Sequence, residues 1–190
     1  ACILQKDAKI GKIIGFYSVV FAAHTLLFFY SQQYFADFGY NKVQISVIML
    51  LVGGASCLGA LASEKMYRRF GKRCLIPETV IIAAAILCYG SGKAGVAAAA
   101  LMCAGFANAA LYPIQSDSLN ALIPSEQRAT LISVDSMCFS IAMIVLFPLA
   151  GALADRWGLK TVLLLLGAIL LLFLLTVFCI EKESFSSDHS

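Results

Sequence analysis

Long, nearly uncharged apolar stretches recur along most of this 190-residue chain and limit how it can fold. An α-helix needs about 20 apolar residues to cross a hydrocarbon core of roughly 30 Å. Apolar residues make up 61% of the chain and charged residues 13%, against about 45–50% and 25% in ordinary globular chains. The charges gather at the termini and in a few short segments, as they do in multi-spanning membrane proteins. The sequence therefore predicts an integral membrane protein.

Six segments are long and apolar enough to be transmembrane helices, and none alternates polar and apolar residues as a β-barrel wall does. We expect an all-α integral membrane fold in which residues 1–190 form one transmembrane domain. The expected spans cover about residues 13–30, 43–62, 74–90, 94–113, 129–154 and 159–180.

Lys and Arg are divided unequally between the two sides that these spans define, with ten on one side and four on the other. Cytoplasmic loops carry the excess of basic residues. We therefore expect a multi-pass protein of the cell membrane with both ends of this segment in the cytoplasm. In this orientation Lys9, Arg69 and Arg128 face the cytoplasm, while Lys93 and Lys160 face outward.

The second and fifth expected spans end on the same sequence. Gly-Ala-Leu-Ala, followed by polar residues, begins at Gly59 and again at Gly151. These positions are equivalent if the chain consists of two three-helix units, which must then face opposite ways across the membrane. The pattern predicts two inverted three-helix repeats, as found in each half of many transporters.

Three stretches resemble the Major Facilitator Superfamily, and the similarity extends from Ile10 to Ile180. Residues 59–73 resemble the family's cytoplasmic loop between helices eight and nine, and residues 120–133 resemble the loop between helices ten and eleven. Residues 148–158 are similar to the end of helix eleven. The resemblance implies a C-terminal six-helix half, preceded by six further helices, with substrate bound near the midplane between the halves. The opening on Ala1 instead of Met also leads us to expect a longer protein.

The resemblance further implies a gating role for residues in these loops, with Gly71 allowing a tight turn. The first stretch departs from the family's strongest pattern, because Ser63, Glu64 and Lys65 stand where Asp-Arg is usual. The third stretch also matches a motif that follows the family's second helix, but the charge count favours helix eleven. The loop-motif candidates are Gly59, Glu64, Arg69, Gly71, Lys72, Arg73, Arg128, Asp155, Arg156 and Gly158.

Polar side chains inside the spans are the candidate functional residues. A charge near the bilayer centre costs something like 2.5–3.5 kcal/mol on insertion scales, so it needs a partner, a wet cavity or a function. Asp135 lies about 9 Å into the fifth span, where it either takes part in coupling or substrate binding or pairs with a loop cation. His24, midway along the first span, either exchanges protons and binds substrate or is satisfied by neighbouring helices.

Uncharged polar residues in and near the spans extend this candidate set. Cavity lining is one interpretation, and interhelical hydrogen bonds or interfacial aromatic anchoring are the alternatives. The substrate or coupling candidates are Asp135, His24, Asn108, Gln115, Tyr30 and Gln33. We expect the small residues around Gly53, Gly54 and Gly59 to allow close helix packing.

These features favour a secondary transporter that moves a small organic solute by alternating access. Transport coupled to protons is compatible with them, and we lean towards efflux of amphipathic compounds. That lean rests on spans rich in aromatic residues and Met, in which Lys160 at the outer edge of the last span is the one Lys or Arg. An uptake permease of the same superfamily is the alternative, as is a six-helix channel or scaffold subunit. The expected partners are membrane lipid, a small-molecule substrate and the missing N-terminal half.

The chain lacks the sequence features of several other classes of protein. The chain contains no GxSxG or HExxH motif, which argues against an enzyme, and its basic residues form no aromatic-laced stripe for nucleic acid. Its seven cysteines are scattered without a CxxC pair. We therefore expect no metal site and no cofactor.

Overall fold

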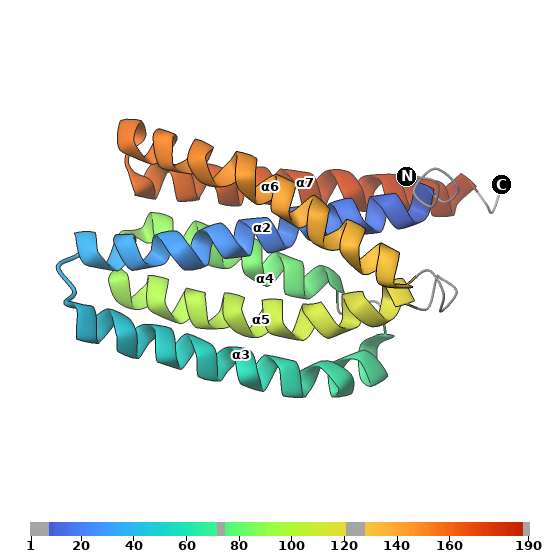
Figure 1. The fold of residues 1–190 in the computed structure, drawn as a ribbon, viewed down its shortest axis with the longest axis horizontal. Helices are drawn as coiled ribbons and strands as arrows, with labels where there is room; N and C mark the ends of the chain where they lie inside the picture. The colour runs from blue at the N-terminus through green and yellow to red at the C-terminus, as the bar shows by residue number, and fades with distance from the viewer. Residues whose placement is uncertain (1–7, 72–74, 121–127, 188–190) are drawn as a thin grey trace.

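The computed structural model describes residues 8–71, 75–120 and 128–187, and this part of the chain is a bundle of helices lying along a common direction (Figure 1). The elements are α2 (Ala8–Asp37), α3 (Lys42–Phe70), α4 (Leu75–Cys88), the 3-10 helix η2 (Tyr89–Ser91), α5 (Ala94–Asn120), α6 (Arg128–Trp157) and α7 (Leu159–Ser187).

Five of the described helices are long and apolar enough to cross a membrane. Their candidate spans are Ile14–Asp37, Lys42–Arg69, Ala94–Asp117, Arg128–Trp157 and Leu159–Thr176. The third expected span corresponds to a shorter apolar helix, Thr79–Ser91. The all-helical membrane fold is thus confirmed, with five long helices and one shorter helix in the described part of the chain.

The observed helices begin close to the predicted starts but extend beyond several predicted ends. α3 continues to Phe70, eight residues past the predicted end of that span. α5 continues through Pro113, which lies inside the helix although we had ended the fourth span there. Proline is tolerated in membrane helices because neighbouring groups can satisfy the backbone that it leaves unpaired. Apolar composition therefore marks the membrane-embedded part of a helix better than its ends.

Successive helices run in opposite directions along the bundle (Figure 1). The start of α2, the end of α3, the starts of α4 and α6 and the end of α7 lie at one end of the bundle. The short connections after α2, η2 and α6 lie at the opposite end. At that end Gly158 alone separates α6 from α7, with a φ of 82° that favours glycine.

Glycine permits a very close approach between α3 and α5, which pack together more extensively than any other pair of described helices. A Cβ atom added at Gly59 would overlap the backbone oxygen of Phe106. On the facing side, a Cβ at Gly105 would lie 2.9 Å from Ser56 Oγ and 3.1 Å from a Val52 methyl. The predicted close packing is confirmed at Gly59, whereas a Cβ at Gly54 would meet nothing within 4 Å.

The end of α4, together with η2, meets α7 through a reciprocal pair of leucine–glycine contacts. The Leu164 side chain fills the space where Gly90 lacks a Cβ, and Leu87 lies 2.9 Å from where a Gly167 Cβ would be. Each partner therefore contributes a leucine followed three residues later by a glycine. A contact of this kind, in which each element offers the same pair to the other, is what a local two-fold relation produces.

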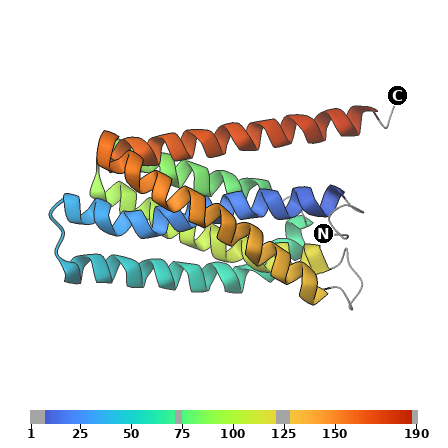
Figure 2. The ribbon, with the colours of Figure 1, turned by 45° about the horizontal axis from the view of Figure 1, so that its top comes forward.

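α6 crosses over α2, as Figures 1 and 2 both show, and aromatic rings fill this crossing. The Tyr30 ring stacks on Phe147 with centroids 5.2 Å apart, and its hydroxyl donates a 2.9 Å hydrogen bond to the Phe147 carbonyl oxygen. Phe29 meets the same Phe147 ring edge-on at 5.8 Å. Tyr30 is thus an interhelical contact of α2 with α6.

Candidate functional site

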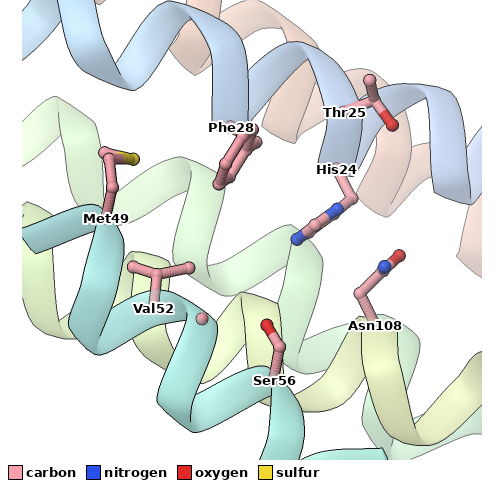
Figure 3. A pocket seen from close by; sticks show the side chains of 8 residues that line it. His24, Thr25, Phe28, Met49, Val52, Ser56 and Asn108 are labelled. Atoms are coloured by element: carbon pink, nitrogen blue, oxygen red, sulfur yellow. The ribbon is translucent and has the colours of Figure 1, made fainter. Parts of the chain in front are cut away.

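A partly open pocket of about 410 Å³ lies between α2, α3 and α5 (Figure 3). α2 and α3 contribute both polar and apolar residues to its wall, and α5 contributes Asn108. The lining residues are His24, Thr25, Phe28, Met49, Val52, Gly53, Ser56 and Asn108.

Helical periodicity explains how three separate helices build this wall. Met49, Val52, Gly53 and Ser56 recur at spacings of three and four, so they share one face of α3. His24 and Phe28 are related in the same way on α2. The polar members lie close to the middle of their spans, because α2 spans Ile14–Asp37, α3 spans Lys42–Arg69 and α5 spans Ala94–Asp117. The pocket is therefore near the mid-depth of the bundle.

Two polar atoms at this pocket are buried and have no hydrogen-bond partner among the described residues. They are His24 Nε2, from α2, and Asn108 Oδ1, from α5. Both side chains point into the space between the helices, with the Ser56 hydroxyl directed towards the same space (Figure 3). A buried polar atom without a partner costs about 1–3 kcal/mol. A bound polar molecule or water would remove this penalty.

The lining residues indicate the chemistry that such a molecule would have. None of them is Asp, Glu, Lys or Arg, so the described wall provides no fixed charge. Phe28, Met49 and Val52 supply an apolar surface, while Asn108 Oδ1 can only accept a hydrogen bond. An apolar pocket with a few convergent polar groups is the usual form of a small-molecule site.

Asp135 and Gln115, two further candidates, lie together but away from this pocket. The Gln115 amide donates hydrogen bonds to both carboxylate oxygens of Asp135, over 3.2 Å and 3.4 Å. This contact joins α5 to α6, which otherwise hardly touch within the described residues. The sequence placed both residues in the candidate set without indicating that they pair.

Tyr30 and Gln33 do not line the pocket. The Tyr30 hydroxyl is engaged by Phe147, and Gln33 donates a 2.7 Å hydrogen bond to Asp37 on the exposed last turn of α2. Cavity lining was one interpretation of both residues, but the rise of the helix carries them from His24 towards the bundle end.

The loop-motif candidates lie mainly on exposed surfaces at the two bundle ends. Glu64 forms an exposed 2.7 Å ion pair with Arg68, one helical turn away, and Arg69 is exposed. Gly71 caps α3 with a φ of 57°, which agrees with the expected tight turn. Lys72 and Arg73 lie outside the described residues. Arg128, Asp155, Arg156 and Gly158 are exposed at the ends of α6.

Sequence reasoning missed several residues of the pocket wall. Thr25, Phe28, Met49 and Val52 are common in membrane helices and carry no distinctive chemistry. Their spacing relative to His24 and Ser56 was the available indication, because it places them on the faces that carry those polar residues. Among the described residues, no group of three or more His, Cys, Asp or Glu side chains could hold a metal ion.

Comparison with known proteins assigns the family. The sequence profile described as Major Facilitator Superfamily matches residues 13–188, nearly the whole chain. No curated protein and no solved structure matches the chain. The profile match, together with several apolar helices of spanning length, identifies a multi-pass membrane protein. The chain therefore belongs to the Major Facilitator Superfamily, a family of secondary transporters.

Proposed function

We propose that this protein moves a small organic solute across the membrane by alternating access, and that the solute binds in the pocket between α2, α3 and α5. The observation that carries this proposal is the pair of buried, unpartnered atoms, His24 Nε2 and Asn108 Oδ1, facing one mid-depth pocket. A solute with hydrogen-bonding groups would satisfy both atoms, and its apolar part would lie against Phe28 and Met49. The lean towards efflux of amphipathic compounds rests on this mixed lining.

The bundle forms the C-terminal half of a longer transporter in this proposal, arranged as two inverted three-helix repeats. Three helix contacts support the repeats, in which α2, α3 and α4 form the first unit and α5, α6 and α7 the second. Two of them are equivalent, because α3 packs on α5 and α6 packs on α2. Leu87 and Gly90 meet Leu164 and Gly167 reciprocally. We further propose that the end of the bundle where α2 begins faces the cytoplasm, which the excess of basic residues on that side supports.

Asp135 is the candidate for proton coupling. It lies seven residues into α6, about 10 Å along the helix axis, and its described partner, the Gln115 amide, is uncharged. A carboxylate in this setting can take up and release a proton during transport.

The basic loop that follows α3 is proposed to act as a cytoplasmic latch against the other half.

Access to the pocket from both sides of the membrane is the first test. In a full-length, cysteine-free protein, Ser56→Cys should react with a membrane-impermeant methanethiosulfonate reagent added from either side, because alternating access opens the pocket to each side in turn. The matched control is Ala83→Cys, fully buried on α4, a helix that does not line the pocket, and it should stay unreacted. Reaction of Ser56→Cys from neither side would contradict the proposal.

Loss of ligand binding is the second test. A panel of uncharged amphipathic compounds would be tested for thermal stabilisation of the purified full-length protein. Asn108→Leu should weaken binding of any stabilising compound about tenfold, because one hydrogen bond is worth roughly 1–1.5 kcal/mol. Ser140→Ala, on the exposed face of α6, is the control. Unchanged binding to both Asn108→Leu and His24→Phe would place the ligand elsewhere.

A further inference from the structure

Asp135 differs from the other carboxylates whose side chains the structure describes. Glu64 is paired with Arg68, and Asp37, Asp117 and Asp155 lie near helix ends. Asp135 lies inside a membrane-spanning helix, and its hydrogen bonds come from the neutral amide of Gln115. A carboxylate at this depth is stabilised by a cation or a proton. The described residues supply hydrogen bonds to it but no positive charge.

An aromatic pair, Tyr112 and Phe21, begins one helical turn from Gln115 on α5. Tyr112 precedes Gln115 by three residues, so the two side chains leave the same face of α5 about 5–6 Å apart at Cβ. The Tyr112 ring packs at 5.8 Å from the Phe21 ring of α2. Gln115 is only 2% exposed, whereas Tyr112 is 62% exposed. The Tyr112 ring is therefore accessible, because α6 makes few contacts with α5. Aromatic faces attract organic cations, most strongly when water is excluded.

We propose that Asp135, Gln115, Tyr112 and Phe21 form a second binding site, selective for an organic cation that carries aromatic or apolar groups. The carboxylate balances the positive charge, and the two rings contact the apolar body. A metal ion does not suit this site, since the described residues form no metal-binding group. Asn108 and Gln115 are seven residues apart on α5, so the carboxylate end of the site lies about 10 Å along the bundle from the solute pocket. Its aromatic end adjoins that pocket, because Tyr112 and Phe21 lie one helical turn from Asn108 and His24. The site goes beyond that pocket and assigns Asp135 a ligand other than the proton.

The test is equilibrium binding of tetraphenylphosphonium to purified full-length protein in lipid nanodiscs. Triphenylphosphine oxide, which is uncharged and similar in its rings, is the matched probe. Asp135→Asn should weaken tetraphenylphosphonium binding at least tenfold and leave the neutral probe unaffected, while Asp135→Glu should restore most of the binding. Tyr112→Leu should weaken cation binding about three- to tenfold, in line with cation–π energies. Asp37→Asn, which removes an exposed carboxylate from the last turn of α2, should leave this binding unchanged.

Several outcomes would overturn the site. The parent protein failing to bind tetraphenylphosphonium is one, and equal binding by the parent and Asp135→Asn is another. If Asp135→Asn fails to fold, Tyr112→Leu and Phe21→Leu decide, because both keep the carboxylate; unchanged binding in these two variants refutes the site. Asp135→Asn should leave binding of uncharged compounds in the solute pocket unchanged, so failure here is distinguishable from failure of that pocket. Loss of stability without loss of cation binding would make Asp135 a structural residue.

Discussion

Two helix crossings that are equivalent in the proposed repeat are built differently. α3 lies against α5 with the backbone of Phe106 directly over Gly59, so the two main chains touch. α6 lies against α2 through the rings of Tyr30 and Phe147, and Gly151, the counterpart of Gly59, faces only the Tyr30 hydroxyl at 3.0 Å from an added Cβ. The repeated Gly-Ala-Leu-Ala sequence therefore produces one backbone-to-backbone contact and one contact through side chains.

The difference shows where the bundle is rigid and where it can adjust. Backbone atoms cannot move without displacing a whole helix, so the α3–α5 contact fixes one wall of the solute pocket. A tyrosine side chain can change its position locally, so the α2–α6 contact tolerates small displacements of α6. Since Asp135 lies on α6, we infer that the cation site is the more adaptable of the two proposed sites.

The largest effect should come from Gly59→Ala. Its methyl group would overlap the Phe106 carbonyl oxygen and force α3 away from α5, and this outweighs the roughly 1 kcal/mol by which Ala favours a helix over Gly. We expect the free energy of unfolding to fall by about 2 kcal/mol, measured by reversible unfolding in mixed micelles containing sodium dodecyl sulfate. Gly54→Ala, on the same helix with nothing within 4 Å, is the control. Equal stability of the two variants would show that this contact is not tight.

A smaller effect is expected from Tyr30→Phe. This change keeps the stacked ring and removes only the hydrogen bond to the Phe147 carbonyl. Interhelical hydrogen bonds in membranes average about 0.6 kcal/mol, so the free energy of unfolding should fall by about that amount in the same assay. Tyr40→Phe, whose hydroxyl forms no hydrogen bond within the described residues, should have no effect. A loss above about 2 kcal/mol would mean that the hydroxyl, and not the ring, holds α6.

The fold could be predicted largely from the sequence because burial in lipid dictates long apolar runs. The starts of α3, α5, α6 and α7 agree with the predicted starts to within one residue. Helix ends were harder to predict. α5 passes through Pro113 and α3 continues through Glu64 and Arg68, since helical hydrogen bonds persist beyond the apolar segment and charged residues at helix ends are compatible with them.

The candidate site was only partly predictable, for a related reason. His24 and Asn108 could be found because polar residues in a span are costly and therefore conspicuous. Which of them meet depends on how α2, α3 and α5 are rotated about their axes, and that rotation is set by contacts such as Gly59 with Phe106. The pairing of Gln115 with Asp135 and the separate role of Tyr30 depend on the same packing.

The smallest effect should come from Gly151→Ala, which changes the counterpart of Gly59 in the same way. Its methyl group would approach the Tyr30 hydroxyl to 3.0 Å, a tight contact with the tip of a side chain that can give way. The helix-propensity gain of about 1 kcal/mol should nearly offset it, leaving unfolding within about 0.5 kcal/mol of the parent. In a Tyr30→Phe background the hydroxyl is absent, so the same change should become stabilising. The two effects are therefore expected to be non-additive in a double-mutant cycle. If Gly151→Ala instead destabilised the protein as much as Gly59→Ala, the two crossings would be equally tight and the comparison would fail.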